Sequence, residues 1–181
     1  MNDRPPQLAH LEHLGDATRF AAQLHALIPK CSLLENFTAG EVRALAQFME
    51  VYRAMEGEEV IREGDGGDFM VMVIEGRIEV NKRDRWNTPQ PIATVEPGRI
   101  LGEMSMIDGA ARFATCVAVG GPALVAVLGR ESLARTIVEQ PMLGAKILME
   151  LVLMLSQRLR VTSDRLMQVL EEQGLHAAGP M

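Results

Sequence analysis

The chain has 181 residues, of which 48% are hydrophobic and 23% charged, as in folded globular proteins rather than disordered or fibrous ones. Its net charge of −6 excludes the basic surplus with which nucleic-acid-binding proteins neutralise phosphates. A chain of this length can bury one core, so we expect one domain with an additional long element.

Cysteine usage and hydropathy indicate where the protein works. The two cysteines, Cys31 and Cys116, stand in unrelated contexts, and we expect both as free thiols. The N-terminus has no apolar signal core, and Glu150 interrupts the longest apolar run, residues 147–155. The sequence therefore predicts a cytoplasmic protein without a membrane span. Its histidines do not cluster with the cysteines and no catalytic constellation emerges, so we expect neither a metal site nor an enzyme.

The first 32 residues are predicted to be a helical segment. Apolar residues recur at helical intervals from Leu8 to Ile28, with Gly15 and Asp16 as an expected break, and Pro29 ends the pattern. After it, Thr38 and Glu41 have the spacing of a capping box, which predicts the start of another helix.

The middle of the chain is typical of β structure. Eleven of the sixteen glycines lie between residues 57 and 129, where they separate short β-rich runs. The predicted strands cover residues 59–62, 68–74, 77–81, 91–95, 112–119 and 123–128. Short strands at this spacing predict an antiparallel barrel or jelly roll. Residues 82–87, basic and with the only Trp, are expected at a solvated hairpin tip, with contact to nucleic acid or a partner protein as the alternative.

A stretch from Gly102 to Ala118 points to an anion site. A short helical turn beginning at Gly102 would present the free backbone N–H groups of Glu103, Met104 and Ser105, which is how proteins hold phosphate. Arg112, at the head of an apolar run, requires an anionic partner and would supply a charged fork.

These residues resemble the phosphate-binding cassette of the cyclic-nucleotide-binding domain family, and the resemblance extends over about residues 33–160. It implies that Glu103 holds the ribose 2'-hydroxyl and that Arg112 holds the cyclic phosphate. Backbone amides around both, including those of Phe113 and Ala114, would complete the cradle. Phe113 departs from the family, since many relatives have Ala or Ser there, and a Ser hydroxyl can bind phosphate. Ala111 is a milder departure, where many relatives have Pro.

Residues 141–173 are predicted to form one long C-terminal helix. Seven residues spaced alternately by four and three form a coiled-coil seam: Leu148, Val152, Leu155, Leu159, Thr162, Leu166 and Val169. The seam can pack on the chain's own barrel, but it is long enough to need another helix, for which a parallel homodimer is the simplest source. By resemblance to the catabolite activator family, Thr162 and Ser163 would bind the adenine amino group. Gln157 and Arg158, one turn earlier, are the alternative lid residues.

The sequence thus predicts an α+β protein in which an antiparallel β roll of about eight strands, residues 33–140, lies between the N-terminal helices and the C-terminal helix. Residues 174–181 are expected to be a flexible tail, too short for a DNA-reading module. The hypothesis is a stand-alone sensor that binds cAMP, or else cGMP or another cyclic nucleotide, and signals through its C-terminal helix to an unidentified effector protein. Two alternatives remain: a dimerisation module with a degenerate pocket, and a transcriptional regulator acting with DNA.

Overall fold

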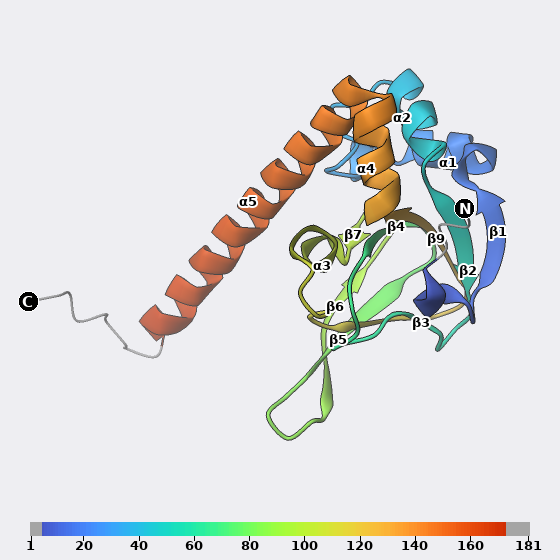
Figure 1. Ribbon diagram of the computed structural model, residues 1–181. Helices are drawn as coiled ribbons and strands as arrows, with labels where there is room; N and C mark the ends of the chain where they lie inside the picture. Colours follow the sequence, from blue (N-terminus) through green and yellow to red (C-terminus); the bar gives the residue numbers. More distant parts are fainter. Residues whose placement is uncertain (1–4, 173–181) are drawn as a thin grey trace, which may run out of the picture.

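Nine strands form two antiparallel sheets in the computed structural model, which describes residues 5–172 (Figure 1). The first sheet has the order β1-β2-β9-β4-β7 and the second β3-β8-β5-β6. The strands are β1 (Glu12–Asp16), β2 (Glu50–Ala54), β3 (Glu59–Ile61), β4 (Phe69–Glu75), β5 (Ile78–Arg83), β6 (Pro89–Val95), β7 (Ile100–Leu101), β8 (Thr115–Ala118) and β9 (Ala123–Gly129). The predicted antiparallel roll is confirmed.

The α-helices lie between β1 and β2, between β7 and β8, and after β9. The α-helices are α1 (Ala21–Ala26), α2 (Ala39–Ala46), α3 (Glu103–Asp108), α4 (Arg130–Glu139) and α5 (Pro141–Glu172), and three short 3₁₀ turns lie at Pro6–Leu8, Ala17–Phe20 and Ile28–Lys30. The capping box at α2 is confirmed, because the Glu41 N–H donates to Thr38 Oγ1 over 3.3 Å and the Thr38 N–H donates to Glu41 Oε2 over 2.8 Å.

The predicted N-terminal helical segment is wrong at residues 12–16, which form the edge strand β1. This strand pairs antiparallel with β2, and its register shifts between His13 and Gly15, where the backbone of Gly15 is left-handed with φ of +101°. Only Leu14 is apolar within residues 12–16, so the local apolar pattern does not specify a helix there, and the strand forms by pairing with β2, 37 residues away at the His13–Glu50 contact. The predicted tail, 174–181, lies outside the described residues.

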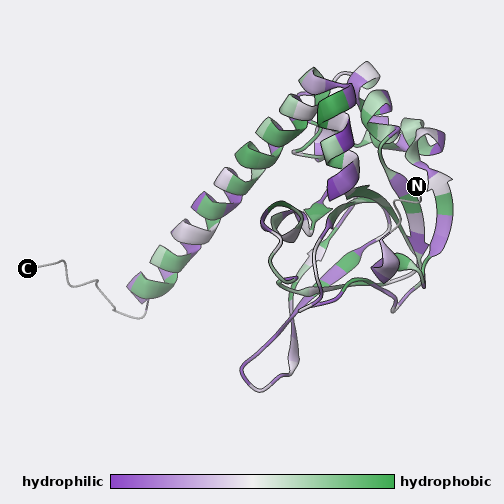
Figure 2. Cartoon of the chain, viewed as in Figure 1, coloured by the Kyte–Doolittle hydropathy of each residue, from purple (hydrophilic) through white to green (hydrophobic). Residues whose placement is uncertain are grey.

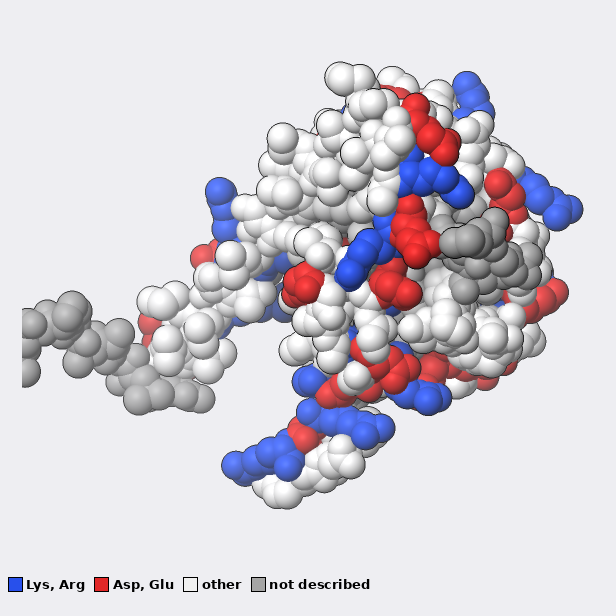
Figure 3. Space-filling model, viewed as in Figure 1, with Lys and Arg blue, Asp and Glu red and all other residues white. Residues whose placement is uncertain are grey.

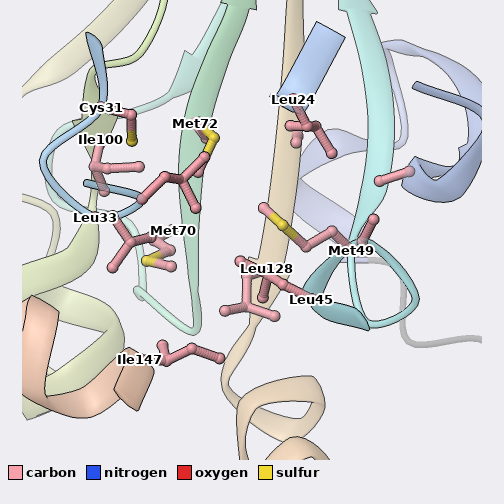
Figure 4. Packing of buried hydrophobic residues seen from close by; sticks show 14 of the residues in the cluster. Leu24, Cys31, Leu33, Leu45, Met49, Met70, Met72, Ile100, Leu128 and Ile147 are labelled. Atoms are coloured by element: carbon pink, nitrogen blue, oxygen red, sulfur yellow. The ribbon is translucent and has the colours of Figure 1, made fainter. Parts of the chain in front are cut away.

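Strand β4 divides the core into two clusters. Its side chains alternate, so that Met70 and Met72 pack into one cluster and Phe69 and Val71 into the other. The first cluster lies between the first sheet and the helices and includes Ile147 of α5 (Figure 4). The second fills the inside of the roll. The continuous apolar run of β4 follows from burial on both faces.

The N-terminal half of α5 is fixed to the domain. Leu143, Ile147, Leu151 and Met154 are buried, and two polar contacts add to this packing: Asn36 Nδ2 donates to Glu150 Oε1 over 2.8 Å, and Lys146 Nζ donates to Glu41 over 2.8 Å. Beyond Met154 the helix extends away from the roll and carries hydrophobic residues with it (Figures 1 and 2).

Most of the predicted seam of α5 does not pack on the chain's own roll. Five of its residues are between 40% and 68% exposed, namely Leu148, Val152, Leu159, Leu166 and Val169. The sequence left open whether the seam packs on the chain's own barrel or on another helix. These five residues do not pack on the barrel. Among residues 5–172, no helix is apolar enough over a sufficient length to span a membrane.

The hairpin between β5 and β6 projects from the roll and carries basic side chains (Figure 3). Trp86 at its tip is 70% exposed, and the guanidinium of Arg85 lies 3.9 Å from the centre of the Trp86 ring. Lys82, nearer the roll, pairs with Glu63 over 2.6 Å. The predicted solvated hairpin tip is confirmed.

Candidate functional site

The connection from β7 to β8 folds around α3, with a left-handed glycine at each end. Gly102 precedes α3 with φ of +76°, and a Cβ added there would lie 2.5 Å from Nη1 of Arg112. Gly109 follows with φ of +74°, and its N–H donates to the carbonyl of Ser105 over 2.9 Å. Both glycines are required by conformation, and the first also allows the arginine to approach the backbone closely.

Arg112 is a buried cation whose charge no carboxylate neutralises at contact distance. Its side chain is only 3% exposed, and Nη1 donates to the carbonyl of Gly102 over 2.8 Å. The guanidinium carbon lies 4.2 Å from the centre of the Phe69 ring. Nη2 is buried without a hydrogen-bond partner, and among the described residues Arg112 makes no ion pair. Burial lowers the pKa of Arg112, while the field of Asp68 opposes that effect.

Glu103, the first residue of α3, is buried and paired across the site with α5. Its side chain is 3% exposed and accepts a hydrogen bond from Nη1 of Arg158. Nη2 of the same arginine donates to the carbonyl of Ile100 over 2.9 Å. Arg158, which the sequence offered only as an alternative lid residue, is therefore the α5 side chain that reaches the cassette.

The turn at residues 64–68 forms a second wall, which supports Arg112 from outside the pocket lining, since the Arg112 N–H donates to the carbonyl of Asp65 over 2.8 Å. A Cβ added at Gly67 would overlap the Cβ of Ser105 and lie 3.2 Å from the guanidinium carbon of Arg112. Ser105 is 4% exposed, and its hydroxyl donates to the carbonyl of Ala111 over 3.3 Å. The sequence analysis assigned residues 64–68 no role in the site. The signal was the pair Gly66-Gly67, of which the second glycine permits the close approach.

Seven of the nine predicted site residues come together around one pocket of about 130 Å³. They are Gly102, Glu103, Met104, Ser105, Arg112, Phe113 and Ala114. The remaining walls are mainly apolar and come from β3, β5, β7 and β8: Ile61, Val80, Leu101 and Cys116, with Arg158 from α5. Burial raises the pKa of the Cys116 thiol to about 12, so this side chain is an uncharged part of the wall.

Two predicted contacts, Met104 and Phe113, are largely exposed, at 54% and 60%. The Phe113 ring lies 4.6 Å from Nζ of Lys82 on the β5–β6 hairpin. Phe113 thus brings no hydroxyl to the pocket, and its backbone N–H is the group that it can offer to an anion.

Thr162 and Ser163 do not line this pocket within one chain. The Thr162 hydroxyl donates to the carbonyl of Arg158 over 2.8 Å, one turn earlier in α5. Thr162 lines a neighbouring groove between α5, β6 and residues 28–35, and Arg158 lines both this groove and the pocket.

Comparisons with known proteins agree with this geometry. Residues 52–140 match the cyclic nucleotide-binding domain. The crystal structure of a cyclic nucleotide-binding domain from Methylobacillus flagellatus is 36% identical, with a TM-score of 0.78 over 91% of this chain and 92% of that one. Human cGMP-dependent protein kinase 2 is 26% identical over 116 residues, and the cAMP-dependent protein kinase regulatory subunit of Dictyostelium discoideum is 26% identical over 96 residues.

These matches cover 64% and 51% of the chain, but only 15% of the kinase and 29% of the regulatory subunit. The likeness to those two larger proteins is therefore confined to one of their parts. The domain from Methylobacillus flagellatus, in contrast, is matched over nearly its full length. Taken with the β roll and its glycine-flanked cassette, the comparisons show that this chain belongs to the cyclic nucleotide-binding domain family.

Proposed function

We propose that this protein senses a cyclic nucleotide and regulates a partner protein, without catalysing a reaction. The observation that carries the proposal is Arg112, a cation 3% exposed, with one N–H group unsatisfied and no ion pair among the described residues. A buried charge without a partner is costly, and an anion at Nη2 would compensate it. The cyclic phosphate is the anion that we assign to it.

The walls beside Arg112 suit the rest of that ligand. Backbone N–H groups of α3 and of Phe113 and Ala114 supply neutral donors for the phosphate. Glu103 offers a buried carboxylate that can accept a hydrogen bond from the ribose 2'-hydroxyl. The apolar walls are available for the base and the sugar faces.

The ion pair between Glu103 and Arg158 links ligand binding in the pocket to the position of α5. A ribose hydroxyl that bonds to Glu103 shares or replaces the contact made by Arg158, and so changes how α5 is held. A ligand shifts an equilibrium only through such a difference in contacts between two states. We therefore assign signal transmission to the half of α5 that extends beyond Met154.

We propose cAMP as the ligand and a parallel homodimer as the working form. The exposed seam of α5 supports a second helix alongside it, because Leu159 and Leu166 are 68% and 58% exposed. In such a dimer Thr162 and Ser163 would read the adenine amino group. Relatives are named for both cAMP and cGMP, so the choice of base rests on these two residues. The effector would be a protein that recognises the dimer, in the cytoplasm.

One alternative has specific support. Phe113 offers no hydroxyl to a phosphate, and Arg158 already occupies Glu103, as expected if the pocket were degenerate and the roll only supported a dimerisation helix. The two functions differ in a single measurable property, which is binding of the nucleotide.

Calorimetric titration with cAMP and then cGMP tests the proposal. The matched variants are Arg112→Ala and Arg135→Ala, the second at a partly exposed arginine on α4, outside the pocket. Saturable binding at micromolar or tighter affinity, lost in Arg112→Ala and kept in Arg135→Ala, is the expected result. Folded protein that gives no heat with either nucleotide would favour the degenerate module.

A further inference from the structure

Arg130, the first residue of α4, holds three backbone carbonyls behind the pocket without lining it. Its Nε donates to the carbonyl of Met106 over 2.7 Å, and its Nη2 donates to those of Ser105 over 3.0 Å and Gly67 over 3.2 Å. Its backbone N–H also donates to the carbonyl of Asp68 over 2.7 Å. Among the described residues, this guanidinium makes no ion pair.

The carbonyls belong to the two walls that meet at the site. Ser105 and Met106 lie in the last turn of α3, where the Ser105 carbonyl also accepts the N–H of Gly109, and Gly67 lies in the facing turn. The two walls are in contact, since a Cβ at Gly67 would overlap that of Ser105. Arg130 therefore bridges the walls from behind, with donors of fixed planar geometry.

We infer that Arg130 is a positioning residue for the ligand's phosphate, which sets the separation of the Gly67 turn and α3 and hence the geometry of the donors beside Arg112. This inference rests on the proposed function of the pocket. It names a residue that touches no ligand atom and acts through the backbone of both walls.

The same contacts make the cradle depend on the C-terminal helices. Arg130 begins α4, and α4 packs closely on α5, since a Cβ added at Gly144 would lie 2.7 Å from the Cα of Ile137. A shift of α4 would move the guanidinium and, with it, the carbonyls that it holds. Two residues thus connect the pocket with α5. Arg158 of α5 contacts the ribose side directly, and Arg130 connects the phosphate side with α5 through α4.

The decisive variant is Arg130→Lys, because lysine keeps the charge but its single nitrogen cannot reproduce the planar fork that reaches both walls. Arg135→Lys, on the same helix, is the matched control. Affinity is measured for cAMP and for its two phosphorothioate diastereomers, in which sulfur replaces one or the other exocyclic oxygen. The ratio of the affinities for the two diastereomers depends on the geometry of the donors around the phosphate. A loss of folded protein lowers both affinities equally and leaves this ratio unchanged.

We expect Arg130→Lys to bind cAMP about tenfold more weakly, the equivalent of one lost charged hydrogen bond, and the diastereomer ratio to move toward unity. Hydrogen exchange of the ligand-free variant is expected to be faster at the amides of α3, with the control unchanged. Unaltered affinity and ratio in Arg130→Lys, with wild-type binding intact, would overturn the inference. Absence of nucleotide binding by the wild type would instead overturn the proposed function, so the two failures are distinct.

Discussion

Glu103 on α3 and Arg158 on α5, 55 residues apart in the chain, form an ion pair whose members are unequally buried. The Glu103 side chain is 3% exposed, whereas that of Arg158 is 37% exposed. Removing the arginine would leave a carboxylate buried without its partner. Removing the glutamate would leave an arginine that can turn toward water. The two single substitutions should therefore differ in cost.

We predict that Arg158→Gln lowers the free energy of unfolding by about 2 kcal/mol, less than the loss of a fully buried pair would cost, because Arg158 is partly exposed. This cost should exceed that of Glu103→Gln, because only Arg158→Gln leaves a buried carboxylate unpaired. The double variant should be more stable than the sum of the single losses implies. A denaturant-based double-mutant cycle measures this, with the exposed Arg160→Gln as the control. Equal costs for the two single substitutions would contradict the prediction.

Gly67→Ala tests the close approach of the two walls. The new Cβ would overlap that of Ser105, so the turn or α3 must shift, at a cost of about 1–3 kcal/mol in stability. Nucleotide affinity should fall more than tenfold, because the donors beside Arg112 move apart. Gly66→Ala is the matched control, since a Cβ there meets nothing within 4 Å. Thermal unfolding and calorimetry of both variants supply the comparison, and parallel behaviour of the two would argue against the wall contact.

Leu159→Glu tests the exposed seam of α5. Leu159 is 68% exposed in the single chain, so the charge should leave the fold of one chain unchanged and place two carboxylates against each other in a parallel dimer. Sedimentation velocity should show the wild type as a dimer and the variant as a monomer. Gln168→Glu adds the same charge on the opposite face of the helix. If both variants sediment like the wild type, the seam is not the interface.

Glu41 is predicted to contribute to stability in a pH-dependent manner. The hydrogen bond from Lys146, followed by those from Thr38, lowers the pKa of Glu41 from 4.5 to about 2. Because the folded-state pKa is the lower one, the contribution is complete above pH 4.5 and is lost as the pH falls toward 2.

Glu41→Gln should therefore cost about 1 kcal/mol at pH 7, the usual value of a helix cap, and the difference from wild type should shrink on acidification. Chemical denaturation between pH 7 and pH 3 measures both, with Glu56→Gln at an exposed position as the control. A difference that stays constant over this range would show that the Glu41 charge does not stabilise the fold.

Features encoded by neighbouring residues could be predicted. The capping box at Thr38 and Glu41 needs only four consecutive residues, and it forms as predicted. Gly102, Glu103 and Arg112 lie within eleven residues, and their spacing indicated the anion site around which the structure gathers them. Strand β4 was also recognisable, since its apolar run is short and bounded by glycine turns.

Features that depend on distant segments could not be predicted in the same way. Residues 12–16 contain a single apolar side chain, Leu14, so no local pattern specifies their structure, and pairing with the edge of β2 makes them a strand. The sequence placed the backbone N–H of Met104 in the cassette, but only the structure shows that its side chain is largely exposed, at 54%.

The sequence by itself determined the family, the roll and the charged groups of the pocket, because each depends on residue types at short fixed spacing. Only the tertiary structure decided that Arg158 meets Glu103, that Gly67 contacts Ser105 and that Arg130 holds both walls. These contacts join segments at least 24 residues apart. Their geometry is set by the packing of β4, β9 and α5 around a shared core, which local patterns do not specify.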